Sequence, residues 1–313
     1  FVPQNYQWLI KDYLHDFLVA RQLIPSSIFH GWNGHCTETL RKARQLGAVT
    51  VVERASSHPE TYEIILKEEY RHWNLPLRPI LPIVKQRLLR ELQTADYITS
   101  PSDFAYESMV NNGVPEKKLI KLPFGGEPPA NQVHTKAHRN RDKEQSAFTV
   151  LFVGQVGVRK GVPYLLEAWR KLNLKEADLF LLGEVEPAAG KIIFPYRMIS
   201  NIHFVGYTDP KPYYEKADVF IFPSIEEGSA LVNYEALAAG LPIITTYNAG
   251  SVVENEKEGF IVPIRDPSAL AERLRFLVDH PARRAEMSEA ALTKAKQYTW
   301  LNYGERLAGA YQR

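Results

Sequence analysis

Short runs of hydrophobic residues alternate along the chain with longer stretches in which apolar residues recur every three or four positions. The short runs are typical of strands in a parallel sheet, and the longer period is typical of amphipathic crossover helices. The pattern predicts strands at 28–30, 48–53, 96–100, 118–122, 149–153, 178–182, 202–205, 218–222, 242–246 and 259–262. It predicts helices at 6–22, 36–46, 60–73, 84–92, 102–112, 163–172, 231–239, 267–278, 281–297 and from 298 to the end. This alternation predicts an α/β fold.

Length and an internal repeat indicate two domains, because 313 residues suffice for two separate cores. The run 95–102 (Ala-Asp-Tyr-Ile-Thr-Ser-Pro-Ser) matches 217–224 (Ala-Asp-Val-Phe-Ile-Phe-Pro-Ser). Each run precedes a helical stretch, a Gly-x-Pro and another strand, so we expect two similar sheets with a ligand site at the carboxyl ends of their strands. The predicted segments are domains at 1–127 and 148–297, a proline-containing basic linker at 128–147, and a final helix at 298–313.

Composition and charge narrow the class of protein. Thirty-eight Lys and Arg against 36 Asp and Glu give a net charge of +2, which argues against a nucleic-acid binder. The hydrophobic fraction of 45% is typical of a globular chain, and no apolar run approaches the ~18 residues of a membrane-spanning helix. Cys36 is the single cysteine, so a reducing, cytoplasmic location is expected. The chain begins at Phe1 without a signal-peptide pattern, which indicates a trimmed N-terminus.

A glycine-containing turn, 154–161 (Gly-Gln-Val-Gly-Val-Arg-Lys-Gly), follows the predicted strand 149–153 and precedes an amphipathic helix. Glycine after a strand lets the backbone approach a ligand closely. The spacing matches neither the P-loop nor the G-x-G-x-x-G motif. Arg159 and Lys160 place two cations at the carboxyl edge of the sheet, where a diphosphate fits; a solvated basic turn is the alternative interpretation.

A second segment, 226–235, runs from a predicted strand into a predicted helix. Residues 228–231 are expected to present free backbone N–H groups at the helix N-terminus, which favours an anion. The Glu235 carboxylate is able to accept hydrogen bonds from vicinal hydroxyls such as those of ribose, and Glu227 from those of a sugar. Glu226 is interpreted only as compensation of the helix dipole.

Together these motifs resemble the donor half of the retaining GT-B glycosyltransferases of family 4, over about half of the chain, from Thr149 to about Gln312. The resemblance rests on the F-V-G strand end, the R-K-G turn, the F-P-S-x-x-E-G loop, the Glu227 and Glu235 pair, the A-x-G-x-P-I-I-T-T strand and the closing Y-T-W helix. It implies a GT-B fold of two Rossmann-like domains facing across a cleft. The N-terminal, acceptor-side domain would be truncated, and the final helix would pack back toward it.

The resemblance also implies roles for individual residues. Its donor site would comprise Gly154, Gln155, Lys160, Tyr207, Gly228, Ser229, Ala230, Leu231, Val232 and Glu235. Its catalytic set would be Glu227, Arg159, Lys160 and His58. Gln155 stands where such enzymes commonly have Arg, and Ser229-Ala230 where they have Phe-Gly, so the donor preference stays open. In the first half, His58 resembles the donor-facing histidine of these enzymes, with a structural histidine as the alternative. His30, His35 and Cys36 fall short of a four-ligand metal set and are interpreted as a loop.

The expected reaction is transfer of a hexose from a UDP- or GDP-sugar to a glycan or lipid-linked acceptor, with retention at the anomeric carbon. No D-x-D pair occurs among the ten aspartates, so cations and a helix N-terminus are expected to stabilise the leaving diphosphate, without metal or other cofactor. A nucleotide-sugar-binding module without transferase activity and a sugar-nucleotide epimerase remain as alternatives. The helix at 84–92 has basic and leucine residues compatible with peripheral contact at the inner face of a membrane. The sequence does not indicate an oligomeric state.

Overall fold

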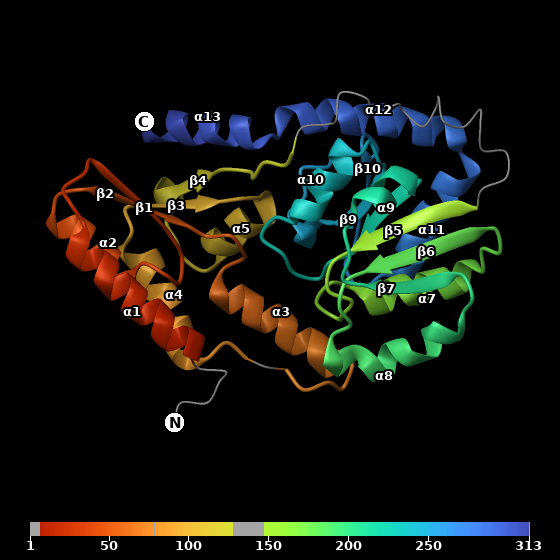
Figure 1. Cartoon of the computed structure of the whole chain (residues 1–313), viewed down its shortest axis with the longest axis horizontal. Coiled ribbons are helices and arrows are strands. Elements are labelled where there is room, and N and C mark those ends of the chain that lie inside the picture. The colour runs from red at the N-terminus through yellow and green to blue at the C-terminus, as the bar shows by residue number, and fades with distance from the viewer. Residues whose placement is uncertain (1–6, 78, 128–146, 313) are drawn as a thin grey trace. The chain divides into compact units, whose positions relative to one another are not determined.

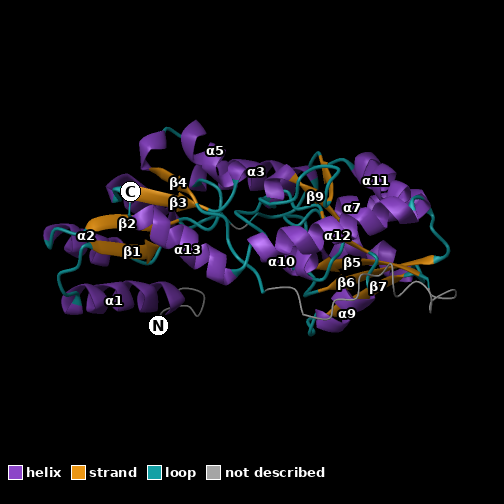
Figure 2. Ribbon diagram, turned by 90° about the horizontal axis from the view of Figure 1, so that it is seen from above, coloured by secondary structure: helices purple, strands orange, loops and turns teal. Residues whose placement is uncertain are grey.

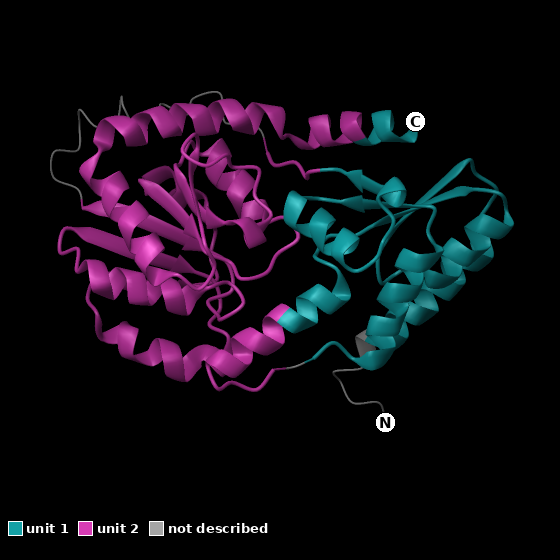
Figure 3. Cartoon of the chain, turned by 180° about the vertical axis from the view of Figure 1, so that it is seen from behind, with its two compact units in different colours: residues 1–64, 78–122, 307–313 teal, residues 65–77, 123–306 magenta. Residues whose placement is uncertain are grey.

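The structure, a computed structural model, describes residues 7–77, 79–127 and 147–312. The chain divides into two compact units, which Figure 3 colours separately. Unit 1 comprises Phe1–Ile64, Arg78–Leu122 and Leu307–Arg313, and unit 2 comprises Ile65–Leu77 and Pro123–Arg306.

Unit 1 contains a parallel four-stranded sheet in the order β1-β2-β3-β4. Its strands are β1 (Ile28–Trp32), β2 (Val49–Glu53), β3 (Tyr97–Ser100) and β4 (Leu119–Lys121). Its helices are α1 (Gln7–Gln22), α2 (Thr37–Gln45), α4 (Pro82–Thr94), α5 (Asp103–Asn111) and the first part of α3 (Pro59–His72). Helix α2 packs against both α1 and α4 (Figure 1). The arrangement is Rossmann-like, with parallel strands joined by helices.

Unit 2 contains a parallel six-stranded sheet in the order β10-β9-β8-β5-β6-β7. Its strands are β5 (Phe148–Val153), β6 (Ala177–Leu182), β7 (Ile202–Gly206), β8 (Val219–Phe222), β9 (Ile243–Thr246) and β10 (Gly259–Val262). Its helices are α7 (Val162–Leu172), α8 (Gly190–Ile193), α9 (Lys211–Lys216), α10 (Leu231–Ala238), α11 (Pro267–Asp279), α12 (Pro281–Gln297) and most of α13 (Trp300–Tyr311). Helix α7 packs against α11 and α10 against α12, and Figure 2 shows strands β5, β6 and β7 side by side.

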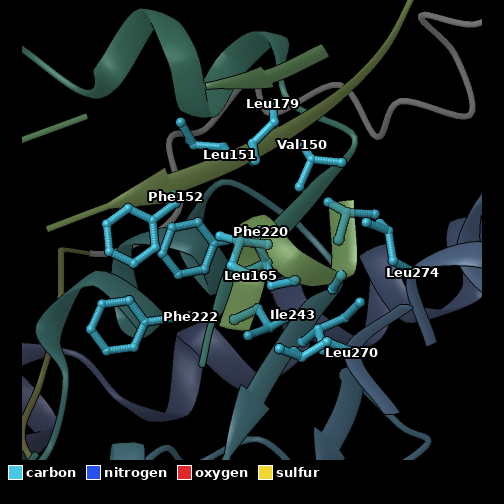
Figure 4. Close-up of a cluster of buried hydrophobic side chains, with 14 of the residues drawn as sticks. Val150, Leu151, Phe152, Leu165, Leu179, Phe220, Phe222, Ile243, Leu270 and Leu274 are labelled. Atoms are coloured by element: carbon cyan, nitrogen blue, oxygen red, sulfur yellow. The ribbon is translucent and has the colours of Figure 1, made fainter. Parts of the chain in front are cut away.

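The two units differ in how their interiors are built. In unit 2 the central strands β5 and β8 are fully buried at Val150, Leu151, Phe152 and Phe220, which join one large apolar cluster (Figure 4). Such strands, covered on both faces, are expected to read as continuous hydrophobic runs. In unit 1 the buried apolar cluster is small: Cys36, Leu40, Val52, Leu92, Ala95, Ile98 and Met109.

Unit 1 adds a buried ionic network to its small apolar cluster. The Arg87 guanidinium donates from Nη2 to Asp16 at 2.9 Å and lies 3.3 Å from Glu91 through Nε. All three side chains are almost completely buried. Glu91 also accepts from the Thr37 hydroxyl at 2.6 Å, and Asp16 from the Thr39 N–H at 3.0 Å, at the start of α2. These charges therefore hold α1, α2 and α4 together.

The α/β class predicted from the sequence, with two Rossmann-like parts, is confirmed. Every predicted strand is present, with ends shifted by at most two residues. The short helices α8 and α9 were not predicted, because four and six residues are too short for a helical period to stand out. The predicted linker, 128–147, lies outside the described residues except for residue 147.

The boundaries of the units differ from the predicted boundaries. Residues 123–127 group with unit 2. Residues 65–77 group with unit 2, because Glu69 on α3 bonds the Arg265 side chain at 2.6 Å and Tyr70 bonds Glu186. Leu307–Arg313 groups with unit 1, since the Tyr311 hydroxyl lies 2.5 Å from Nδ1 of His30. Helices α3 and α13 thus contribute residues to both units.

Candidate functional site

The glycine-containing turn leaves the carboxyl end of β5 and leads into α7. Its last residue, Gly161, has φ +69°, and a Cβ there would lie 2.0 Å from the Pro223 carbonyl oxygen, so only glycine fits. Gly157 is required for space: a Cβ would lie 2.3 Å from Oε2 of Glu186. The turn is therefore packed between the segments that follow β6 and β8, and Gly157 makes room for a side chain of the protein itself.

The two cations of the turn contact the carboxylate predicted to be catalytic. Nη1 of Arg159 lies 2.9 Å from Oε1 of Glu227, and the Lys160 ammonium contacts the same oxygen. Burial and the neighbouring Arg159 charge lower the pKa of Lys160 to about 7, against the opposing effect of Glu226. The Lys160 ammonium also lies 5.3 Å from the centre of the Phe222 ring. Three of the four residues in the predicted catalytic set are thus within contact distance in unit 2.

Glu226 has a different position from the one that the sequence suggested. It is completely buried and lies five residues before α10 begins, too far to compensate the helix dipole. Its backbone carbonyl accepts from Nη1 of Arg159 at 3.0 Å, and its carboxylate lies 3.5 Å from the same nitrogen. Glu226 therefore fixes the Arg159 side chain, which itself reaches on to Glu227.

The segment before α10 offers fewer free amides than expected. The N–H of Ala230 donates to Ala249 at 3.1 Å, so the prediction of a free amide at this position was wrong. Gly228, Ser229 and Ala230 are buried, and the Ser229 hydroxyl lies 3.0 Å from the Tyr234 hydroxyl. Leu231 and Val232 are the first two residues of α10, where N–H groups have no partner within the helix. The Ala230 amide is therefore already used within the protein, and α10 itself contributes the N–H groups of Leu231 and Val232.

Glu235, the predicted ribose ligand, is exposed on α10. One of its oxygens accepts from the Tyr214 hydroxyl at 2.8 Å. Burial and the Glu235 charge raise the pKa of Tyr214 well above its usual value, so the hydroxyl keeps its proton and stays a donor. Tyr214 was not predicted as a site residue, because it comes from the unpredicted helix α9 and belongs to no motif.

The remaining predicted donor residues stand at strand ends of the same sheet. Gly154 directly follows β5, and Gln155 is exposed beside it. Tyr207 follows the last residue of β7 and is 88% exposed. Carboxyl ends of parallel strands lie at one edge of a sheet, so these positions share that edge with Arg159 and Lys160. Neither Gln155 nor Tyr207 makes a side-chain hydrogen bond within the described part of the chain.

His58 belongs to unit 1, where it precedes the first residue of α3. Its Nδ1 accepts from the Glu60 N–H at 3.3 Å, so the imidazole caps the helix. Burial and then the Arg54 charge lower the pKa of His58 to about 4, which leaves the ring neutral at pH 7. His58 therefore has a structural role in unit 1, whatever its part in catalysis.

Across residues 7–77, 79–127 and 147–312, no group of three or more His, Cys, Asp and Glu side chains is placed to hold a metal ion. In the same residues, no helix is both long enough and apolar enough to cross a bilayer.

The part of unit 2 that contains the turn, Glu227 and Glu235 is similar to a known protein family. Residues 147–280 match the family model described as "Glycosyl transferases group 1". The chain contains a group 1 glycosyltransferase domain. The domain covers β5 to α11, with the glycine-containing turn, Glu227 and Glu235.

Curated relatives of this glycosyltransferase domain carry matching names. A D-inositol 3-phosphate glycosyltransferase of Corynebacterium diphtheriae is 31% identical over 176 residues, which are 51% of this chain and 41% of the relative. The chain spans about half the length of the curated relatives that it matches, between 41% and 58%.

Solved structures share the fold of the whole chain. A sucrose-phosphate synthase of Thermosynechococcus elongatus superposes with a TM-score of 0.72 at 20% identity, covering 100% of this chain and 80% of that one. The Anabaena protein HepE, solved in complex with UDP, gives a TM-score of 0.70 at 14% identity, covering 98% and 84%. At these identities the likeness shows the fold, which confirms the GT-B fold predicted from the sequence, and not the substrates.

Proposed function

We propose that the protein is a retaining, metal-independent hexosyltransferase that moves a sugar from a UDP- or GDP-sugar to a glycan or lipid-linked acceptor. The observation that carries this proposal is the contact of Arg159 and Lys160 with Glu227, inside the glycosyltransferase domain. The donor diphosphate would bind these two cations. The structure of HepE with UDP, a protein of the same fold, is in keeping with a uridine nucleotide.

The chemistry follows from the charges of the cluster. As the anomeric bond breaks, the nucleoside diphosphate gains negative charge, which fixed cations at the bond stabilise without reorganisation. Arg159 is suited to two phosphate oxygens through its planar guanidinium, and Lys160 to one. The N–H groups of Leu231 and Val232 add the positive end of the α10 dipole.

Glu227 would change partners when the donor binds. In the structure its Oε1 is shared by Arg159 and Lys160. Phosphate oxygens would replace it on both cations, which would leave the Glu227 carboxylate to accept from the donor-sugar hydroxyls. Glu235, oriented by Tyr214, would accept from the ribose hydroxyls.

A nucleotide-sugar-binding module without transferase activity is the second candidate. It is favoured by the burial of residues 228–230 and by the occupied N–H of Ala230, since these reduce the donors available to a developing charge. Acceptor-dependent turnover separates the two candidates, because only a transferase consumes the donor faster when an acceptor is added.

Calorimetric titration of the chain with UDP, GDP and ADP, in the presence of EDTA, tests the site. We expect one nucleotide to bind, and Lys160→Ala and Glu235→Ala each to weaken it at least tenfold. Lys175→Ala and Glu272→Ala remove exposed charges of the same unit and should bind as the wild type does. Proton NMR of the product with the matching sugar nucleotide then reports the anomeric configuration. Absence of binding by all three nucleotides, or loss of binding only in EDTA, would contradict the proposal.

A further inference from the structure

Glu186 lies in the segment after β6 and reaches into the glycine-containing turn. Its Oε2 accepts from the Val158 N–H at 3.1 Å. The two segments also pair through their backbones, since Val156 donates to Glu184 at 2.8 Å and Glu186 donates back to Val156 at 3.0 Å. The Glu186 carboxylate therefore holds the residue directly before Arg159.

The other oxygen of Glu186 is bound by a residue that is remote in sequence. The Tyr70 hydroxyl, on α3, donates to Oε1 of Glu186. The same segment is fixed to unit 2 by two further contacts. Trp73 lies 5.4 Å from Tyr164 of α7, measured between ring centres, and Glu69 accepts from the Arg265 side chain at 2.6 Å. Tyr70 is thus presented to Glu186 from a fixed position.

The turn is held on its opposite side by the segment after β8. The Arg159 carbonyl accepts from the Ile225 N–H at 2.9 Å and lies 3.2 Å from the Ser224 hydroxyl. The turn is thus anchored at the Val158 N–H and at the Arg159 carbonyl. The side chains of Arg159 and Lys160 both contact Glu227. The absence of a side chain at Gly157 is what allows Glu186 to approach.

We propose that Glu186, oriented by Tyr70, is a positioning residue that fixes the direction of Arg159 and Lys160 for binding of a diphosphate. This inference rests on the proposed function of the site. A carboxylate near an anion site repels the ligand unless its charge is otherwise engaged. Here both oxygens of Glu186 accept hydrogen bonds, from Val158 and Tyr70, so its charge is used to order the turn.

Substitutions at both ends of this hydrogen-bonded chain test the proposal. We expect Glu186→Ala and Tyr70→Phe to weaken binding of the nucleoside diphosphate by about tenfold and threefold. Glu186→Gln should rescue most of the loss, because the amide oxygen still accepts from Val158. The double variant should bind no more weakly than Glu186→Ala alone, since the proposed effect of Tyr70 on binding passes through Glu186.

Titration with the corresponding nucleoside distinguishes positioning from a general structural defect. The nucleoside lacks phosphate, so its affinity should be the same in the wild type and in all four variants. Glu184→Ala and Lys67→Ala, exposed neighbours of Glu186 and Tyr70, serve as controls and should bind the diphosphate as the wild type does. Thermal unfolding checks that every variant is folded.

The outcomes separate this inference from the function on which it rests. If the wild type binds a nucleoside diphosphate and Glu186→Ala binds it equally well, the positioning role is overturned while the donor site stands. An equal loss of nucleoside and diphosphate affinity also overturns it, because the defect would then be general. If the wild type binds none of UDP, GDP and ADP, the proposed function fails and this inference fails with it.

Discussion

The repeated eight-residue pattern occurs in both units. The strand that it forms is the same in the two units, whereas the segment that follows the strand differs. In unit 1, 95–102 contains β3, and in unit 2, 217–224 contains β8. Each aspartate of the pattern fastens its strand to the neighbouring one: Asp96 accepts from the Thr50 N–H at 2.9 Å, and Asp218 from the Thr149 N–H at 2.8 Å. The strand and its fastening are therefore common to the two units.

The two copies diverge after the strand. Ser102 caps α5, accepting from the Ala105 N–H at 3.1 Å, and the helix begins at the next residue. Ser224 caps no helix; its hydroxyl lies 3.2 Å from the Arg159 carbonyl, and six residues separate it from α10. Those six residues include Glu226 and Glu227. The inserted segment, and not the shared strand, therefore contains the predicted catalytic residue Glu227.

The largest expected effects come from truncating the equivalent buried positions of the two strands. Ile98→Ala and Phe220→Ala should each lower the free energy of unfolding by about 3–5 kcal/mol, because both side chains are completely buried. Hydrogen exchange resolved along the chain should show faster exchange in unit 1 for Ile98→Ala and in unit 2 for Phe220→Ala. Ile98→Val and Phe220→Leu are the mild controls. Equally faster exchange in both units would show that they unfold together, which would contradict two independently stabilised units.

Acid should destabilise unit 1 through His58. Its pKa is lowered from 6.5 to about 4 in the folded chain, so the unfolded chain binds the proton first as the pH falls. The stability from this residue is complete above pH 6.5 and is lost between pH 6.5 and 4, by at most about 3 kcal/mol. Chemical denaturation at a series of pH values measures it. His58→Asn keeps a helix-capping side chain and should lack this step, whereas His15→Asn, on the exposed surface of α1, should keep it.

Asp96 and Asp218, which each accept from an N–H of the neighbouring strand, allow the same substitution to be compared in the two units. Asp96→Ala and Asp218→Ala should each cost about 1–2 kcal/mol of unfolding free energy, because each removes the acceptor of a strand N–H. Asp96 also accepts from the Thr50 hydroxyl at 2.7 Å. Thermal unfolding measures both, with Asp279→Ala as an exposed control. A loss of stability at only one of the two positions would mean that this hydrogen bond does not stabilise both units.

The smallest expected effects, of about 1 kcal/mol, come from the two serines. Substitution of Ser102 should affect stability, and substitution of Ser224 should affect nucleotide binding. Ser102→Ala should lower stability by about 1 kcal/mol and leave nucleotide binding unchanged, since it removes a helix cap. Ser224→Ala should weaken diphosphate binding severalfold, because it removes one of the two donors to the Arg159 carbonyl and leaves only the Ile225 N–H. Calorimetric binding and thermal unfolding of both variants decide this. Weaker nucleotide binding in Ser102→Ala, or unchanged binding in Ser224→Ala, would contradict the different roles inferred for the two serines.

Much of the fold was predictable from the sequence because the strands of a parallel sheet are short, continuous apolar runs. Strand β5 is the predicted run 149–153 with one residue added at its start, and β10 coincides with the predicted run 259–262. The turn and the Glu227 and Glu235 pair were also predicted, since they follow strands at recognisable spacings. Glu226 was misinterpreted, because its burial and its contact with Arg159 depend on how the segment after β8 folds over the turn.

The sequence by itself determined which residues form strands and helices, that two related α/β units exist, and that cations and carboxylates follow strands β5 and β8. These properties are local, since they depend on period, composition and spacing within one element. The tertiary structure decided which side chains meet. Tyr70 and Glu186 are separated by more than a hundred residues, as are His30 and Tyr311, and no local pattern relates them. Only packing of the folded chain brings such pairs into contact. The pair of Tyr70 and Glu186 is the one that anchors the turn of the proposed donor site.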